Sequence, residues 1–228
     1  MWGIMALCVA AFAIEIAMPE QKLARAMMLF GIVPRRFTDP AWAAGVGFPS
    51  TYWGFLTSMF LHGGWLHIIS NLWILWIFGD NVEDRMGPLR FLLFYLFCGA
   101  ASGIAHTLAN PASQVPAIGA SGAIAGVLAA YMLLFPLAQV VCLVPIFFYP
   151  LFIQVPAYFF ILIWFGLQFA SGAAALLSPD EVAGVAWWAH IGGFAAGLLT
   201  FRLFLIRQPK RRPLFPDEHG IEGAWHRR

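Results

Sequence analysis

Long apolar runs separated by short polar stretches form the main pattern along this chain. A helix needs about 20 mostly apolar residues to cross the hydrocarbon of a bilayer. The pattern therefore predicts six membrane-spanning helices, at residues 2–18, 61–79, 89–109, 119–135, 156–177 and 185–206. The predicted fold class is an all-α polytopic membrane protein, with one six-helix membrane domain over residues 1–206.

Three polar segments interrupt or follow these runs. Residues 19–60 hold four basic side chains among apolar patches, which predicts a segment lying on or partly in the outer membrane surface. Residues 79–90 are the most charged interior stretch, and we expect them to form a short loop outside the bilayer. Residues 207–228 are polar and predict a disordered cytoplasmic tail.

Residues 137–155 are uncharged and long enough to span a membrane. However, Pro145, Pro150 and Pro156 each remove a backbone donor and disturb a helix. Unsatisfied backbone groups are costly in lipid. The sequence therefore predicts an interfacial segment on the cytoplasmic side rather than a seventh span.

Composition supports a membrane protein. The chain is 61% hydrophobic and 11% charged over 228 residues, whereas soluble domains carry roughly 25% charged residues. The net charge of +2 is too small to indicate a nucleic-acid partner. Cys8, Cys98 and Cys142 lie far apart in apolar stretches, which predicts small buried hydrophobic side chains rather than a disulfide or metal site.

Lysine and arginine in the flanking loops decide the orientation. Six spans place residues 79–90 and 207–228 on the same side, and both segments are rich in arginine. Residues 19–60 would lie on the opposite side of the membrane, and their four basic residues argue against calling the side of 79–90 and 207–228 cytoplasmic. The balance predicts a cytoplasmic C-terminus in the cell (inner) membrane. The first eighteen residues lack a basic start and contain Glu15, so they predict a first span rather than a cleaved signal peptide.

Polar side chains inside membrane spans are costly and often functional. His67 and Asn71 are four residues apart and so share one helical face. His62 and His67 are five apart, which is not the spacing of a helical zinc pair, and we predict neither metal nor cofactor. The polar residues singled out within the spans are His62, His67, Asn71, His106, Ser121 and His190.

Small residues surround two of these polar groups. Gly122 and Gly126 follow Ser121, and Gly193 and Gly197 follow His190. Small faces let two membrane helices approach closely. Ser121 and His190 both lie near the starts of spans that run in the same direction, so the sequence predicts that the hydroxyl and the imidazole meet near the outer surface.

Three motifs in this order resemble the rhomboid family of intramembrane serine proteases. Gly119-Ala120-Ser121-Gly122 matches GxSG, and residues 189–197 match AHxxGxxxG. His62, His67 and Asn71 match HxxxxHxxxN, and "GDNVEDR" after them resembles the family's loop. The resemblance covers the six-helix core from about residue 53 to 200.

The resemblance implies an endopeptidase that cleaves transmembrane helices of membrane proteins within the lipid bilayer. It implies Ser121 as nucleophile and His190 as general base, with an acyl-enzyme intermediate. The implied oxyanion donors are the Ser121 backbone N–H, the Asn71 amide and the His67 ring. Supporting roles fall to Gly119, Gly122, His62, Gly193 and Gly197.

Two positions depart from the family pattern. Ala125 stands where an aromatic residue often stacks on the base histidine, so Trp187 or Trp188 is a candidate support for His190. A tryptophan–arginine pair of some members reads Trp53-Gly54 here. Two other functions stay open: an inactive relative that binds membrane helices, and a small transporter whose histidines form a proton path.

Overall fold

The computed structural model describes residues 1–48, 52–146, 149–177 and 186–206. Its helices are α1 (Trp2–Ala17), α2 (Glu20–Phe30), α3 (Pro34–Thr38), α4 (Pro40–Gly45), α5 (Gly54–Thr57), α6 (Trp65–Met86), α7 (Pro88–Ala109), α8 (Ser121–Leu134), α9 (Ala157–Leu177) and α10 (Trp187–Phe204). A 3-10 turn covers Ser58–Phe60, and the strands are β1 (Gln139–Ile146) and β2 (Tyr149–Pro156). The predicted tail at 207–228 lies outside the described residues.

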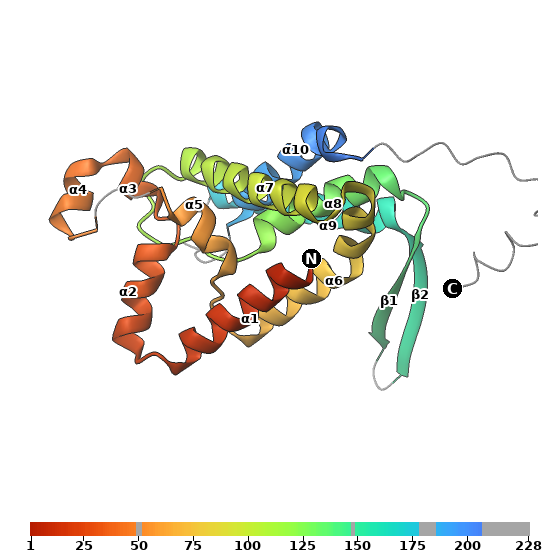
Figure 1. The fold of residues 1–228 in the computed structure, drawn as a ribbon, viewed down its shortest axis with the longest axis horizontal. Coiled ribbons are helices and arrows are strands. Elements are labelled where there is room, and N and C mark those ends of the chain that lie inside the picture. Colours follow the sequence, from red (N-terminus) through yellow and green to blue (C-terminus); the bar gives the residue numbers. More distant parts are fainter. Residues whose placement is uncertain (49–51, 147–148, 178–185, 207–228) are drawn as a thin grey trace, which may run out of the picture.

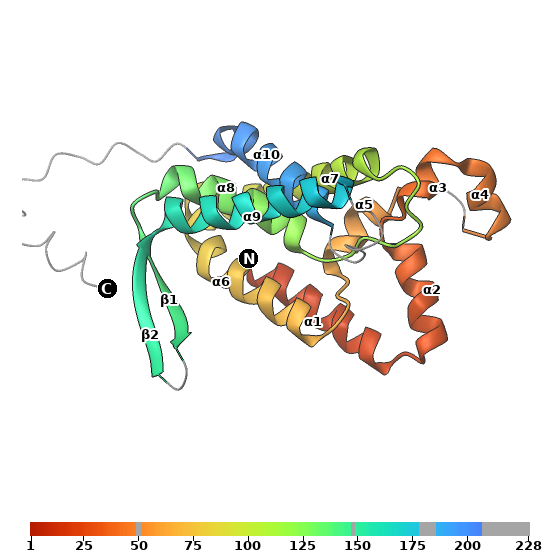
Figure 2. The same ribbon diagram turned by 180° about the vertical axis from the view of Figure 1, so that it is seen from behind.

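The long helices α7, α8, α9 and α10 lie side by side and form the main body of the molecule (Figure 1). Helix α1 packs along α6, and the short helices α2 to α5 gather at one end of the body. The β1–β2 hairpin projects from the opposite end, across the direction of the long helices in both views (Figure 2). The two ends of the bundle are therefore built differently.

Helix α8 is the centre of the bundle, and every residue from Gly122 to Tyr131 is buried. It contacts α6, α7, α9 and α10. A Cβ atom added at Gly197 of α10 would lie 2.6 Å from the Cα of Gly126, and one added at Gly193 would lie 2.8 Å from the carbonyl carbon of Gly122. The predicted close approach of these two helices is confirmed, because backbone meets backbone at both glycine pairs.

The six predicted spans correspond to α1, α6, α7, α8, α9 and α10. Among the described helices, α7 alone is long and apolar enough to cross a membrane by itself. Gly54–Phe60 and Trp65–Met86 meet that standard together, as a pair bent by 94°. Trp2–Ala17, Ser121–Leu134 and Ala157–Ser171 are apolar but shorter. The count of six spans therefore stays a prediction.

The predicted loop at residues 79–90 is wrong. Helix α6 continues through the charged residues to Met86, and α7 begins at Pro88, directly after Gly87. Charged side chains do not end a helix. The stop comes from Gly87, whose φ of 76° suits glycine at a helix C-terminus, and from Pro88 at the first position of the next helix.

Strands β1 and β2 pair antiparallel, in unbroken register from Gln139 opposite Pro156 to Ile146 opposite Tyr149. Pro145, Pro150 and Pro156 thus lie in a two-stranded β-ribbon and not in a helix, in line with the prediction that this segment is not a helical span. Both faces of the ribbon are apolar, since Val141, Leu143 and Phe152 share one face and Leu151 and Ile153 the other. These side chains are exposed in the isolated chain.

Gly193→Leu tests the close approach of α8 and α10. A side chain at 193 would push the backbone of Gly122 away, and overpacking of this kind costs roughly 1–3 kcal/mol or more. We expect the thermal unfolding temperature in detergent to fall by several degrees. Gly166→Leu on α9 is the matched control, because a Cβ there meets nothing within 4 Å. Equal unfolding temperatures for the two variants would contradict the packing described.

Candidate active site

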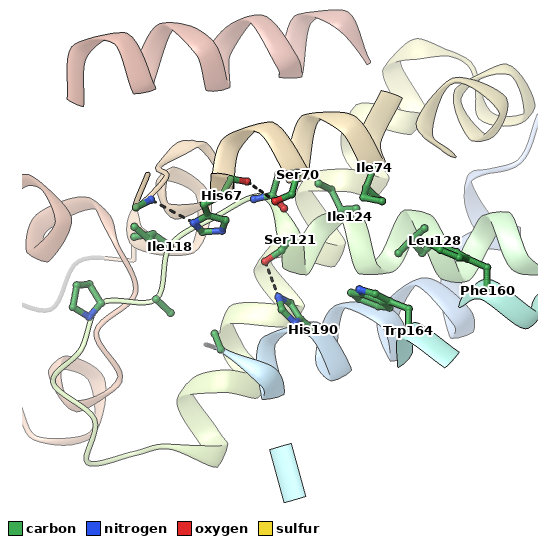
Figure 3. A pocket seen from close by; sticks show the side chains of 15 residues that line it. His67, Ser70, Ile74, Ile118, Ser121, Ile124, Leu128, Phe160, Trp164 and His190 are labelled. Atoms are coloured by element: carbon green, nitrogen blue, oxygen red, sulfur yellow. Dashed lines mark hydrogen bonds between the residues drawn. The ribbon is translucent and has the colours of Figure 1, made fainter. Parts of the chain in front are cut away.

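Ser121 and His190 face each other across the contact between α8 and α10 (Figure 3). Ser121 is the first residue of α8, and its Oγ lies 2.7 Å from Nε2 of His190 in the first turn of α10. This is hydrogen-bond distance. The predicted meeting of the hydroxyl and the imidazole is therefore present in the structure.

The loop before Ser121 is held in one shape by glycine and by distant backbone. Gly119 has a φ of 119°, which L side chains rarely adopt, and a Cβ there would lie 2.6 Å from Nε2 of His67. Its N–H donates to the carbonyl of Ser58 at 2.8 Å. Ile32 and Ala117 exchange two backbone hydrogen bonds. Ser58 and Ile32, both between α1 and α6, therefore fix the path of this loop.

His67 and Asn71 both line the same cavity as Ser121. The N–H of Gly63 donates to Nδ1 of His67 at 3.4 Å, so the ring carries its proton on Nε2, next to Gly119. The Asn71 side chain is buried, and its Nδ2 has no hydrogen-bond partner among the described residues. Both α6 residues thus offer an N–H donor toward the start of α8, where backbone N–H groups also lack helical partners.

His62 lies behind His67 rather than in the cavity. Its ring is 1% exposed and its centroid lies 5.2 Å from that of His67, edge to face. The backbone N–H of His62 donates to the buried carboxylate of Glu15 on α1, at 3.2 Å. This agrees with a supporting position for His62, and it ties α1 to the turn that begins α6.

A cavity of about 480 Å³ opens beside Ser121. Figure 3 shows Ser121 between His67 and His190, with Leu128 and Phe160 further along. The polar groups cluster at one end, and the walls beyond them are apolar. The lining residues are Gly63, His67, Ser70, Asn71, Ile74, Pro116, Ala117, Ile118, Ser121, Ile124, Leu128, Phe160, Trp164, Ala186 and His190.

The His190 ring is supported by neighbours that the sequence reading largely missed. The ring centroid of Trp164 on α9 lies 5.8 Å from that of His190, with 42° between the ring planes. The ring centroid of Trp187 lies 6.3 Å from that of His190, edge to face. Trp187 was a predicted support, whereas no ring contact of Trp188 with His190 is found in the described part of the chain. The Oε1 of Gln168 lies 2.6 Å from Nδ1 of His190.

A buried arginine of α3 binds the end of α2. Arg36 is 1% exposed and donates to the carbonyls of Met28 and Leu29 at the end of α2. Burial lowers the pKa of Arg36. On the surface nearby, the Trp42 N–H and then the Arg35 guanidinium lower the pKa of Asp39. The sequence reading counted both arginines only as charges and missed the buried one.

No group of three or more His, Cys, Asp or Glu side chains that could hold a metal occurs in the described ranges. The three cysteines are free, and Cys98 lies against Gly126 in the core. His106 of α7 lies outside the main cavity and contacts the side chain of Asn110.

A model of the rhomboid domain matches residues 49–207. The chain is 42% identical over 81 residues to the rhomboid protease GluP of Bacillus subtilis (strain 168), covering 36% of this chain and 15% of that protein. It is 42% identical over 82 residues to rhomboid-like protein 11, chloroplastic, of Arabidopsis thaliana, covering 36% and 29%. With the human presenilin-associated rhomboid-like protein, mitochondrial, identity is 29% over 178 residues, covering 73% and 42%.

Fold and comparisons together define a helical, polytopic protein embedded in a membrane. The chain belongs to the rhomboid family. It spans less than half the length of the curated relatives named above.

Arg36→Ala tests whether the buried arginine holds α3 against the end of α2. Hydrogen bonds to charged groups contribute about 1.5–3 kcal/mol, so the end of α2 should loosen. We expect limited proteolysis within residues 19–60 to accelerate severalfold. Arg35→Ala is the control, because Arg35 forms a half-exposed ion pair with Asp39 and such pairs contribute little. Equal cleavage rates for the two variants would rule out the anchoring role.

Proposed function

We propose that this protein is an intramembrane serine endopeptidase that cleaves transmembrane helices with a dyad of Ser121 and His190. The observation that carries the proposal is the 2.7 Å contact between Ser121 Oγ and His190 Nε2. Membership of the rhomboid family, which includes a relative named as a protease, supports it.

The chemistry follows from the positions of these two groups. His190 Nε2 takes the proton of the Ser121 hydroxyl as Oγ forms a bond to the substrate's peptide carbonyl carbon. The resulting tetrahedral oxyanion collapses, the C–N bond breaks, and the imidazolium gives its proton to the leaving amine. Water then repeats these steps on the acyl-enzyme and releases the second product.

The oxyanion needs donors that are already in place. The Ser121 N–H at the start of α8, the Asn71 amide and the His67 Nε2–H are the proposed three. The support is geometric, since a Cβ at Gly119 would lie 2.6 Å from His67 Nε2 and 3.7 Å from Asn71 Nδ2. Asn71 Nδ2 also has no partner within the described residues, as a donor reserved for the transition state would.

The proposed substrate is a membrane helix that unwinds locally. A peptide bond inside a helix is shielded by its own hydrogen bonds, so attack by Ser121 requires an extended segment. The cavity of about 480 Å³ is polar near Ser121 and apolar toward Leu128. We therefore expect small residues at the cleaved bond and apolar residues beside it.

The proposed topology has six spans over residues 1–206, with the C-terminus in the cytoplasm of a cell (inner) membrane. The 14 residues of α8 measure about 21 Å at 1.5 Å per residue, less than the roughly 30 Å of hydrocarbon. Ser121 would then lie below the outer surface. Residues 137–155 would lie at the cytoplasmic interface, and 207–228 would form the polar tail.

Cleavage by the purified protein tests the proposal. In liposomes with a single-span reporter, the wild type should produce two fragments, and Ser121→Ala and His190→Ala should abolish cleavage. Loss of one oxyanion donor costs about 10²–10³-fold, so Asn71→Ala should retain weak activity. The rates are measured from gel bands over time.

A fluorophosphonate probe separates this proposal from an inactive helix-binding relative. The wild type should be labelled at Ser121, and His190→Ala should not. Absence of labelling in a folded wild type would favour the binder. Solute or proton flux in liposomes that persists in Ser121→Ala would favour a transporter instead.

A spin label at Phe152→Cys tests the interfacial position of residues 137–155, in a variant whose three cysteines are replaced by alanine. An apolar two-stranded ribbon has no core of its own in water, so we expect the label to contact the headgroup boundary. Its oxygen accessibility should exceed that of a label at Asp84→Cys, the control at the charged end of α6. Accessibility equal to the control would place the ribbon in water.

A further inference from the structure

His190 makes a second short contact, on the side of its ring away from Ser121. Nδ1 lies 2.6 Å from Oε1 of Gln168, and Nε2 lies 2.7 Å from Ser121 Oγ. The imidazole is thus bonded at both nitrogens, between α8 and α9. No acidic side chain takes part in these two contacts.

The contact of Nδ1 with Gln168 determines which nitrogen of His190 carries the proton, and therefore what Nε2 offers to Ser121. A side-chain carbonyl oxygen only accepts hydrogen bonds, so its partner Nδ1 must carry the proton. A neutral imidazole has one N–H, and Nε2 is then left with its lone pair facing the Ser121 hydroxyl. The opposite tautomer would present an N–H to Ser121 and could not take its proton.

We infer that Gln168 is a positioning residue: its carbonyl oxygen holds His190 in the tautomer and orientation that can accept the Ser121 proton. This inference rests on the proposed protease function. It assigns to a neutral amide the orienting role that a third carboxylate has in soluble serine proteases.

The same face of α9 supplies a second support. Trp164 and Gln168 are four residues apart on α9, so they lie on one side of the helix. The indole of Trp164 packs 5.8 Å from the His190 ring. Residue 125, four after the serine, is a buried alanine and has no ring to stack. The support of His190 therefore comes from α9 instead of α8.

The setting of Gln168 also favours a bonded role. Helix α9 carries no charged residue, and its sequence around position 168 is apolar. A polar amide on a membrane helix is stabilised when it bonds across to another helix. Gln168 meets this condition through His190 on α10.

Gln168→Met tests the inference, because methionine keeps the length and removes the acceptor. We expect kcat for a single-span reporter to fall about 10- to 100-fold with little change in KM, since a displaced catalytic group can cost up to about 10²-fold. Gln154→Met, an exposed glutamine of β2, is the matched control and should cleave at the wild-type rate. Wild-type kcat in Gln168→Met would overturn the inference.

Gln168→Glu tests the contact through the pH dependence of cleavage, which would not change if Gln168 only packed against His190. The carboxylate still accepts from Nδ1, so cleavage should be largely retained. Its negative charge favours the imidazolium, and the pH at which activity falls on acidification should move upward relative to the wild type. The other titratable side chains near His190 are His67 and His106, and both are kept in every variant. An unmoved pH profile would count against direct contact.

The tautomer can be measured without any cleavage, which separates this inference from the proposed function. In protein labelled with ¹⁵N-histidine, the His190 signals are identified by their loss in His190→Ala. The neutral wild-type ring should carry its proton on Nδ1, and Gln168→Met should lose this preference. A proton on Nε2 in the wild type would refute the inference even if the protein cleaves. The Nδ1 tautomer in a protein that does not cleave would uphold it and refute the protease.

Discussion

The close approach of α8 and α10 is the constraint on which the rest of the structure depends. Packed helices usually lie 8–10 Å apart, and the contacts at Gly122–Gly193 and Gly126–Gly197 bring backbone against backbone. Ser121 and His190 stand at the start of this contact, one on each helix. Neither side chain is long, so a wider separation of α8 and α10 would break the hydrogen bond between Ser121 and His190. The glycines therefore belong to the site although they carry no reactive group.

A second constraint comes from the loops that surround the start of α8. The backbone N–H groups of the first turn of α8, which begins at Ser121, have no partner within the helix. They can bind a substrate only if the loop before Ser121 leaves them accessible. Gly119 makes the required turn, while the backbones of Ser58 and Ile32 form hydrogen bonds with the loop. Arg36 of α3 in turn binds the end of α2. The contacts that position Ser121 therefore extend from the loop before α8 into the short helices near the N-terminal part of the chain.

Much of this could be predicted from the sequence because glycine, serine and histidine are conspicuous in apolar helices. The meeting of Ser121 with His190 is predicted from the small residues that follow each of them, whereas the six spans stay a prediction. The end of α6 does not follow from the charged residues at 80–85, because Gly87 and Pro88 end the helix. Gln168 and Trp164 were missed because their contact with His190 depends on how α9 is rotated. Only tertiary packing fixes that rotation, although a lone glutamine in an uncharged helix was a usable signal.

The use of an amide beside His190 agrees with the cost of charge in a membrane. A carboxylate within a span costs several kcal/mol unless it is paired or hydrated, and it would draw water toward the base. A carbonyl oxygen accepts the same Nδ1–H without a net charge. It stabilises the imidazolium less than a carboxylate would. In the proposed protease, more of the catalysis must therefore come from the proposed oxyanion donors Asn71 and His67. For the proposed dyad, preorganised oxyanion donors and a neutral orienting group are therefore the arrangement that a low-dielectric site favours.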